Sequence, residues 1–196
     1  MKRLIAASVV FLAACACAVF AQDAKTPSEP EYVNTFSLLD NDGVLKPLER
    51  QAARVNTKVK MLGFGGGAAS YVVSNEHSPV RFSADASLRF VVRPEGPSFG
   101  PSGAAGNVDP ATIVQLYALK VAKGQREIQI VRAGAFRGAK NTQADASVPF
   151  EIAKYGEHSV VVKPSTPLPP GEYMWATNAA FMVPQGYCFG VDPAKP

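Results

Sequence analysis

Apolar side chains occupy every second position in several short segments of the chain. This two-residue period is typical of β-strands, whose successive side chains point to opposite faces of a sheet. In the first such segment the intervening positions include Arg89 and Arg93, which predicts a strand with one solvent-facing side. The segments with this period are residues 88–93, 127–130, 158–164, 171–177 and 186–192.

Turn residues and one helix signal lie between these segments. Asp-Asn-Asp-Gly at residues 40–43 predicts a tight turn. Residues 47–55 predict a short helix, because Pro47 suits a first helical turn and three apolar residues then fall on one side. Two stretches rich in small, polar, glycine or proline residues, 94–110 and 133–147, are expected to be long loops.

Residues 109–124 carry two conflicting signals. Asp109, Pro110 and Gly124 stand where the cap, first turn and end of a helix over residues 110–123 would place them. The apolar residues between them do not keep to one helical stripe, however, and suit a strand buried on both faces. We expect the strand, turning at Lys123-Gly124 into a second strand, and the helix is the alternative.

Together these elements predict an all-β fold: a single β-sandwich with at most one or two short helices. Near the end, Pro-Pro-Gly-Glu-Tyr at 169–173 is followed by Gly-Tyr-x-Phe-x-Val at 186–191. This pair of motifs resembles the closing hairpin of bacterial immunoglobulin-like modules, and the resemblance implies an immunoglobulin-like sandwich. One such group, the periplasmic copper carriers, uses histidines near the mature N-terminus. None lies there in this chain, so no copper site or other cofactor is expected.

The first residues are typical of a secretory signal peptide. Lys2 and Arg3 precede an apolar run that ends at Ala21, before polar Gln22. Cleavage between Ala21 and Gln22 would leave 175 of the 196 residues, enough for one domain with its own core. The predicted organisation is a signal peptide over residues 1–21, a flexible tether over 22–30 and one β-sandwich domain over 31–196.

A second interpretation of the N-terminus is a lipoprotein. Leu12-Ala13-Ala14-Cys15 resembles the bacterial lipobox, in which Cys15 would be acylated and become the mature N-terminus. An uncleaved membrane anchor is a third alternative, since the apolar run just reaches the length of a short span. All three place the folded domain outside the cytoplasm, and a lipid at Cys15 is the membrane contact we expect.

Charge and cysteine content exclude several function classes. The formal charge of +4 includes Lys2 and Arg3, so the processed chain would carry +2, too little for the dense basic face that nucleic acid requires. Beyond Cys15 and Cys17 in the signal region there is one cysteine, Cys188, which cannot form an internal disulfide. We expect it to be a buried, inert thiol.

Two glycine-containing motifs suggest ligands, and neither has the context it needs. Gly63-x-Gly65-x-x-Ala68 matches a dinucleotide fingerprint, but the strand-forming residues 70–73 follow where a helix is required. We therefore expect these glycines to relieve a bend or bulge between strands. The turn at 40–43 resembles part of a calcium loop, but Leu38 and Lys46 would stand at ligand positions, which favours an ordinary turn.

Candidate catalytic residues are scattered along the chain. A Ser-His-Asp hydrolase would need His77 or His158, and no G-x-S-x-G motif is present. Around His77 the sequence places Ser74, Glu76 and Ser78, but neighbours on a loop do not make a triad. Nothing in the sequence pairs carboxylates as glycosidases require, and no zinc-ligand spacing occurs. The unpaired acids considered for a glycosidase are Asp85, Glu95, Glu127 and Glu151.

Arginines recur around the predicted strands. If the strands at 88–93 and 126–132 were neighbours, these side chains would line one sheet face, either as an ordinary solvated surface or as a shallow basic surface for acidic polymers. The arginines concerned are Arg81, Arg89, Arg93, Arg126 and Arg132. The sequence thus indicates an exported, non-catalytic binding or structural module whose partner is an envelope protein or polymer. A small secreted hydrolase is the alternative.

Overall fold

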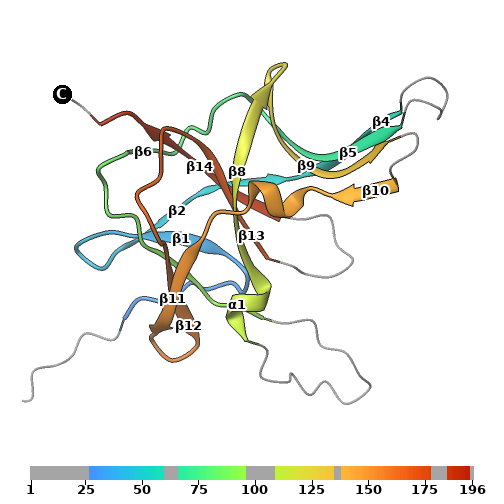
Figure 1. The fold of residues 1–196 in the computed structure, drawn as a ribbon. Coiled ribbons are helices and arrows are strands. Elements are labelled where there is room, and N and C mark those ends of the chain that lie inside the picture. The colour runs from blue at the N-terminus through green and yellow to red at the C-terminus, as the bar shows by residue number, and fades with distance from the viewer. Residues whose placement is uncertain (1–26, 60–65, 96–108, 135–137, 178–184, 195–196) are drawn as a thin grey trace, which may run out of the picture.

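The computed structural model describes residues 27–59, 66–95, 109–134, 138–177 and 185–194. The fold is all-β, with two sheets packed on each other as in a sandwich (Figure 1). The smaller sheet has five antiparallel strands. In spatial order these are β11 (Phe150–Tyr155), β12 (Ser159–Pro164), β7 (Phe90–Val92), β1 (Phe36–Leu39) and β2 (Leu45–Pro47).

The larger sheet curls back on itself. Its path begins at β3 and ends at β4, and these two strands are consecutive in the chain with only Ala53 between them. Two further strands lie beside the path: β10 (Gly138–Asn141) pairs with β9, and β6 (Arg81–Ser83) runs parallel to β14. The path is β3 (Glu49–Ala52), β14 (Gln185–Asp192), β13 (Gly171–Thr177), β8 (Val114–Ala122), β9 (Gln125–Gly134), β5 (Gly67–Ser74) and β4 (Arg54–Val59).

An aromatic core fills the space between the two sheets. Trp175 of β13 is fully buried at its centre and stacks on Phe36 of β1, with ring centroids 5.4 Å apart. Phe90 of β7 and Phe150 of β11 meet the same indole edge-on, at 5.6 and 5.2 Å. Three strands of the small sheet therefore contact one side chain of the large sheet, and this contact holds the sandwich together.

A second core lies on the other face of β13 and β14, inside the curl of the large sheet. Met174 and Cys188 point to this side and are at most 1% exposed. They pack with Tyr117 of β8, Ile128 of β9 and Val73 of β5. Because both faces of β13 and β14 are covered, these two strands are buried along most of their length.

Residues 109–124 combine both of the predicted signals. The Asp109 carboxylate accepts a hydrogen bond from the Ala111 amide and caps a single turn, α1 (Pro110–Ile113). The chain then continues as β8, turns at Lys123 and Gly124, and returns as β9, as the hairpin interpretation predicts. Both turn residues have positive φ, 53° and 77°, which matches the twist of a two-residue hairpin.

Three local predictions are wrong. Residues 47–55 form the end of β2, all of β3 and the start of β4, not a helix. The predicted solvent-facing side of the strand at 88–93 does not exist within β7, because Val91 is fully buried. The predicted loop at 133–147 contains β10 and a 3₁₀ turn at Gln143–Ala146, and its residues 135–137 lie outside the described residues.

The glycine stretch connects two neighbouring strands, as expected. β4 and β5 pair antiparallel on either side of it, and β5, not a helix, follows the glycines. Gly66 has φ +80°, and a Cβ atom there would clash with the Ala133 carbonyl of β9. The β5–β9 register shifts between Ala69 and Ser70, which marks a bulge. Gly63 and Gly65 lie outside the described residues.

The closing segments and the end of the predicted tether are also placed. β13 and β14 pair antiparallel, while the immunoglobulin-like form of the sandwich stays a prediction. Glu29, from the predicted tether, packs against the turn between β11 and β12. Its carboxylate accepts hydrogen bonds from the Glu157 and His158 amides of that turn. Within the described residues, no helix has the length and apolarity needed to cross a membrane.

Replacing the central indole tests the role of the aromatic core. We expect Trp175→Ala to lower the free energy of unfolding by about 3–5 kcal/mol, because it leaves a cavity between the sheets. Trp175→Phe should cost less, since it keeps ring contacts and removes an N–H that has no hydrogen-bond partner among the described residues. Urea unfolding followed by far-UV circular dichroism measures both. Val44→Ala, at a half-exposed side chain, is the control, and an equal loss there would contradict this assignment.

Candidate functional site

Arg126 of β9 is the centre of a buried ionic cluster. Its side chain is fully buried, and its guanidinium donates two hydrogen bonds to the Glu49 carboxylate of β3, at 2.8 and 3.0 Å. Nε donates to the Asn75 carbonyl at 3.1 Å, and Nη2 also donates to the Ser74 carbonyl at 2.8 Å. The charge is thus paired and hydrogen-bonded on every side, as a buried arginine requires.

Glu172 of β13 extends the cluster toward the surface. Its carboxylate is 3% exposed, lies 3.6 Å from Nη1 of Arg126, and accepts a 2.9 Å hydrogen bond from the Ser78 amide. Arg81 of β6 donates to it at 2.7 Å and also binds Asp192 of β14 at 2.6 Å. We call Glu49, Arg81, Arg126, Glu172 and Asp192 the ionic cluster. It ties β3, β6, β9, β13 and β14 together at one end of the second core.

The cluster sets the protonation of its members. Burial raises the pKa of the Glu49 carboxyl, but hydrogen bonds from Arg126 and Gln51 outweigh this and hold that pKa below its ordinary value. Hydrogen bonds to Asp192 and Glu172 raise the pKa of Arg81. Glu49 is therefore a carboxylate and Arg81 a guanidinium cation at neutral pH. Glu49 does not provide a buried carboxylic acid that could donate a proton, and Arg81 does not provide a neutral base.

The structure pairs His77 with an acid that is distant in sequence. Nδ1 of His77 lies 3.2 Å from Oε1 of Glu172, while the ring is 66% exposed. The Ser78 hydroxyl is buried and directed at the Cys188 carbonyl, so it is not placed to attack a substrate. Among the described residues, no Ser, Thr or Cys side chain is hydrogen-bonded to this ring. The neighbourhood of His77 in the sequence does not form a triad.

His158 lies elsewhere, on the exposed β11–β12 turn. Its Nε2 is 3.7 Å from the Glu157 carboxylate, in a pair that is largely open to water. The two histidines are in different parts of the sandwich, so they do not share one site. Cys188 is fully buried, as predicted, and burial raises the pKa of its thiol to about 12, which disfavours the reactive thiolate.

No metal site is assembled in the part of the chain that the structure describes. No group of three or more His, Cys, Asp or Glu side chains in it could hold a metal ion. At the predicted turn, the Asp40 carboxylate accepts hydrogen bonds from the Asp42 and Val44 amides, as in an ordinary turn. Two of the acids considered for a glycosidase lie in surface ion pairs, Glu127 with Lys58 and Glu151 with Lys163.

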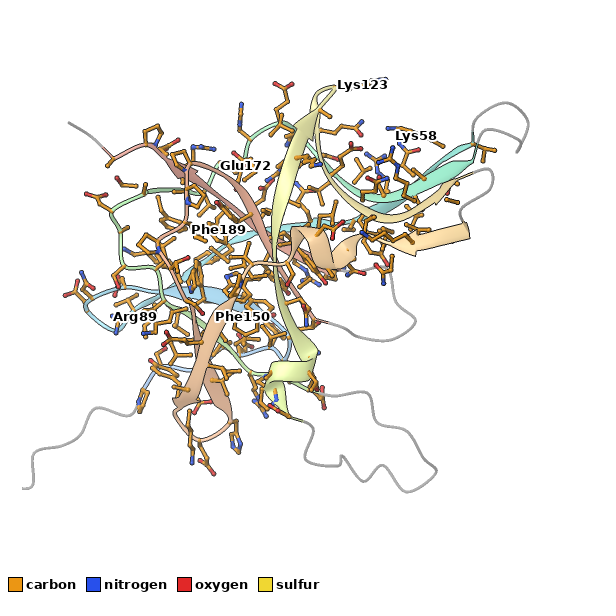
Figure 2. The ribbon with its side chains drawn as sticks, in the orientation of Figure 1. Lys58, Arg89, Lys123, Phe150, Glu172 and Phe189 are labelled. Carbon is orange, nitrogen blue, oxygen red and sulfur yellow. The ribbon has the colours of Figure 1, made fainter. Side chains whose placement is uncertain are left out.

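The arginine face considered for paired strands 88–93 and 126–132 does not form. β7 and β9 belong to different sheets, so the strands that would carry it are not neighbours. Arg126 is buried and Arg81 is committed to the ionic cluster. Of the five arginines considered, Arg132 is an exposed side chain on β9, and Figure 2 shows Arg89 on the small-sheet side, far from that strand.

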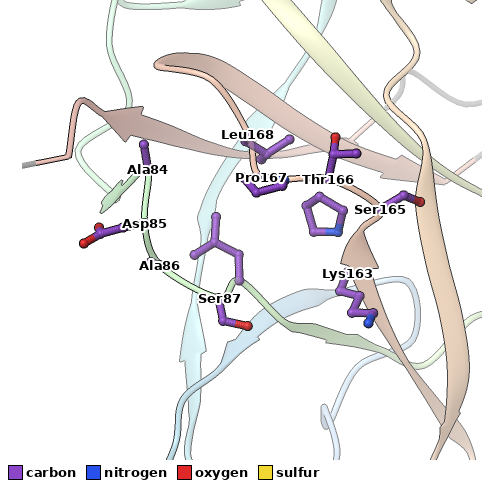
Figure 3. Close-up of a pocket in the computed structure, with 11 residues that line it drawn as sticks. Ala84, Asp85, Ala86, Ser87, Lys163, Ser165, Thr166, Pro167 and Leu168 are labelled. Atoms are coloured by element: carbon purple, nitrogen blue, oxygen red, sulfur yellow. The ribbon is translucent and has the colours of Figure 1, made fainter.

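A shallow surface pocket lies between the loops that follow β6 and β12 (Figure 3). Its volume is about 320 Å³, and Leu88 and Leu168 are its buried apolar residues. Asp85 and Lys163 bring opposite charges to the rim, and Lys163 is already paired with Glu151 at 2.9 Å. Hydroxyl groups of Ser87, Ser165 and Thr166 complete a lining without a histidine or a second carboxylate. The pocket can hold a small polar group but has no acid–base pair.

The exposed end of the large sheet forms the other feature of interest. We define the arm as β4, β10, residues 67–69 of β5 and residues 131–134 of β9. It projects from the body of the sandwich (Figure 1), and every residue of β4 and β10 is exposed. Val55 and Val59 are 62% and 65% exposed, which is unusual for aliphatic side chains on a strand.

Comparison with known proteins gives no functional assignment. No protein-family model, no curated protein and no solved structure matches this chain. The predicted processing residues Ala21 and Gln22, and the alternative lipid site Cys15, lie outside the described residues.

Sequence reasoning missed the ionic cluster, although part of its signal was visible. Arg126 stands two residues before Ile128, so the strand period already placed it on an inward-facing side. In the same way Glu172 alternates with Tyr173 and shares its face with Met174. A charged residue in register with buried neighbours predicts a buried ion pair, but it does not identify the partner.

Removing Arg126 tests whether the ionic cluster is structural. We expect Arg126→Met to lower the free energy of unfolding by about 3–5 kcal/mol at pH 7, because Glu49 loses its main partner and Glu172 loses a nearby positive charge. Arg132→Met, on the same strand but exposed, is the control and should change stability by less than about 0.5 kcal/mol. Equal losses in the two variants would contradict the assignment.

The same variant has an expected pH dependence. The folded pKa of Glu49 lies below its ordinary value of 4.5, so its contribution is present above that pH and is lost as the pH falls through the lowered value. In Arg126→Met the buried carboxyl gains a proton more readily, so the deficit relative to the native protein should narrow at pH 4. Urea unfolding at pH 4 and pH 7 measures this difference, and a deficit that widens in acid would contradict it.

Proposed function

We propose that this chain is an exported, non-catalytic binding module of the bacterial cell envelope, and that it binds through the arm. The observation that carries the proposal is the exposure of β4 on both faces, including Val55 and Val59. Exposed apolar side chains on an edge strand favour association with another molecule, so we infer that a partner covers Val55 and Val59.

The distribution of reactive groups supports a binding role over catalysis. Within the described residues, the ionic cluster consists of paired charges, and the two histidines lie apart on exposed segments. The alternative, a small secreted hydrolase, would draw on the His77–Glu172 contact, which resembles the acid–base half of a triad. Ser78, the serine next to His77, has its hydroxyl buried and turned to a backbone carbonyl.

The export part of the proposal rests on residues 1–21. Their basic start, apolar run and small residues before Gln22 are the features that the secretion machinery reads. The partner is then an envelope protein or polymer. Any membrane contact would come from a lipid at Cys15.

Intact-mass analysis of the chain produced in a Gram-negative host tests export. We expect a mature protein that begins at Gln22, or one that begins at an acylated Cys15. Replacing Cys15 with Ser should leave the first mass unchanged and abolish the second, which separates secretion from lipid attachment. Full-length protein recovered from the cytoplasm would contradict export.

Capture of the purified protein by an envelope fraction tests the binding role of the arm. We expect native protein to sediment with envelope fragments of the source bacterium, and Val55→Asp/Val59→Asp to reduce the bound fraction at least about tenfold, because two charges would enter the interface. Val44→Asp, at a similarly exposed valine outside the arm, should bind as native protein does. Thermal unfolding of each variant checks the fold, and no sedimentation of native protein would contradict the proposal.

A further inference from the structure

The arm has two chemically different faces. Residues directly opposite each other in antiparallel strands share a face, and successive residues alternate between faces. One row across β4, β5, β9 and β10 is Lys58, Ala68, Arg132 and Lys140. The next row is Val59, Gly67, Ala133 and Ala139, on the opposite face. The arm therefore has a cationic face and an apolar face of small side chains.

The edge strand β4 repeats this division within six residues. Arg54, Asn56 and Lys58 lie on the cationic face, and Val55, Thr57 and Val59 lie on the apolar face. The Lys58 ammonium, labelled in Figure 2, is 57% exposed, and its ion pair with Glu127 is long, at 3.8 Å. Arg54 donates a 3.3 Å hydrogen bond to the Ser74 hydroxyl, which leaves its charge unneutralised there. Two cations are thus available beside the edge.

Among the strands that the structure describes, β4 is also an open edge of the large sheet. It pairs with β5 on one side and ends the strand order on the other. An edge strand presents backbone N–H and C=O groups that another extended segment can pair with. Other edges of the sandwich are less suitable: β2 has three residues and ends at Pro47, and β11 has its Phe150 and Ile152 side chains packed on the core.

We propose, building on the binding role of the arm, that β4 accepts an extended segment of a partner protein as an added strand, and that this segment alternates acidic and apolar residues. Its backbone pairs with the free edge of Arg54–Val59. Its acidic side chains lie beside Arg54 and Lys58, and its apolar side chains cover Val55 and Val59. A single bound segment then neutralises the cations on one face of β4 and buries the valines on the other.

Repulsion between like charges excludes a second copy of this chain as the occupant. Two β4 strands paired antiparallel about a two-fold axis normal to the sheet keep their faces, so Arg54 and Lys58 of one copy would adjoin those of the other. Four cations would gather on one side of the added pair. Cationic residues on an edge strand discourage self-pairing in this way, while they leave an acidic partner free to bind.

Backbone amide spectra of the ¹⁵N-labelled protein, in its mature N-terminal form, test this proposal. The probe is a capped heptapeptide that alternates valine and glutamate. We expect chemical-shift changes across Arg54–Val59 and slowed hydrogen exchange at the alternate amides that point to the free edge. The matching valine–lysine peptide should bind about tenfold more weakly. Capped heptaglutamate carries more negative charge without apolar alternation, and it should bind more weakly than the valine–glutamate peptide.

A charge swap makes the test specific. Arg54→Glu/Lys58→Glu should reverse the preference, so that the valine–lysine peptide binds about tenfold more tightly than the valine–glutamate peptide. Lys154→Glu, on the edge strand β11, is the matched control and should leave the native preference unchanged. Spectra without changes at β4, or with changes centred on β10, would overturn the proposal. Heptaglutamate binding as tightly as the valine–glutamate peptide would also overturn it, because this would indicate a general surface for polyanions.

The envelope assay separates this proposal from the binding role of the arm. If Arg54→Glu/Lys58→Glu sediments with envelope fragments as native protein does, while Val55→Asp/Val59→Asp does not, strand addition by an acidic segment is wrong and the binding role of the arm stands. If both variants fail to sediment and the native protein prefers the valine–glutamate peptide, the results support both the binding role of the arm and strand addition by an acidic segment.

Discussion

The fold depends on burying both faces of the β13–β14 pair. Tyr173 and Trp175 point into the aromatic core, and Met174 between them points into the second core. Because neither face of the pair reaches water, the small sheet must cover one side and the curl of the large sheet the other. The break at Ala53, where β3 passes into β4, lets one length of chain close that curl.

This double burial explains why the charged residues of the second core are paired. Glu49 and Arg126 lie on inward-facing positions of strands that the curl brings together, so the Arg126 side chain is fully buried and the Glu49 side chain is only 9% exposed. Their mutual hydrogen bonds compensate for lost hydration, and a lone charge there would destabilise the fold. The cluster therefore specifies which strands meet at this end of the core. Its position next to the exposed His77 does not by itself make it a catalytic site.

Sequence patterns predicted the elements whose conformation depends on neighbouring residues. They failed for features that depend on contacts between distant segments. The hairpin at Lys123-Gly124 and the cap at Asp109 were identified because their backbone preferences are encoded within a few residues. The strand at 49–52 was mistaken for a helix because Glu49 and Gln51 face inward, so the apolar alternation of a strand is missing. The partners of Arg126 come from distant segments, and one sequence does not reveal such pairings.

The arm begins where the second core ends. Tyr71 and Ile128 still pack on that core, and the register shift at Ala69/Ser70 follows directly. Beyond the bulge, one face of the sheet carries mostly alanine, glycine and valine, and the other carries Lys58, Arg132 and Lys140. The sheet therefore has too little apolar volume there to build a core of its own. It persists as an extension of strands that are anchored inside the body. The cations of the arm disfavour pairing between the β4 strands of two copies of this chain. The exposed valines of β4 therefore remain available to a strand of different chemistry.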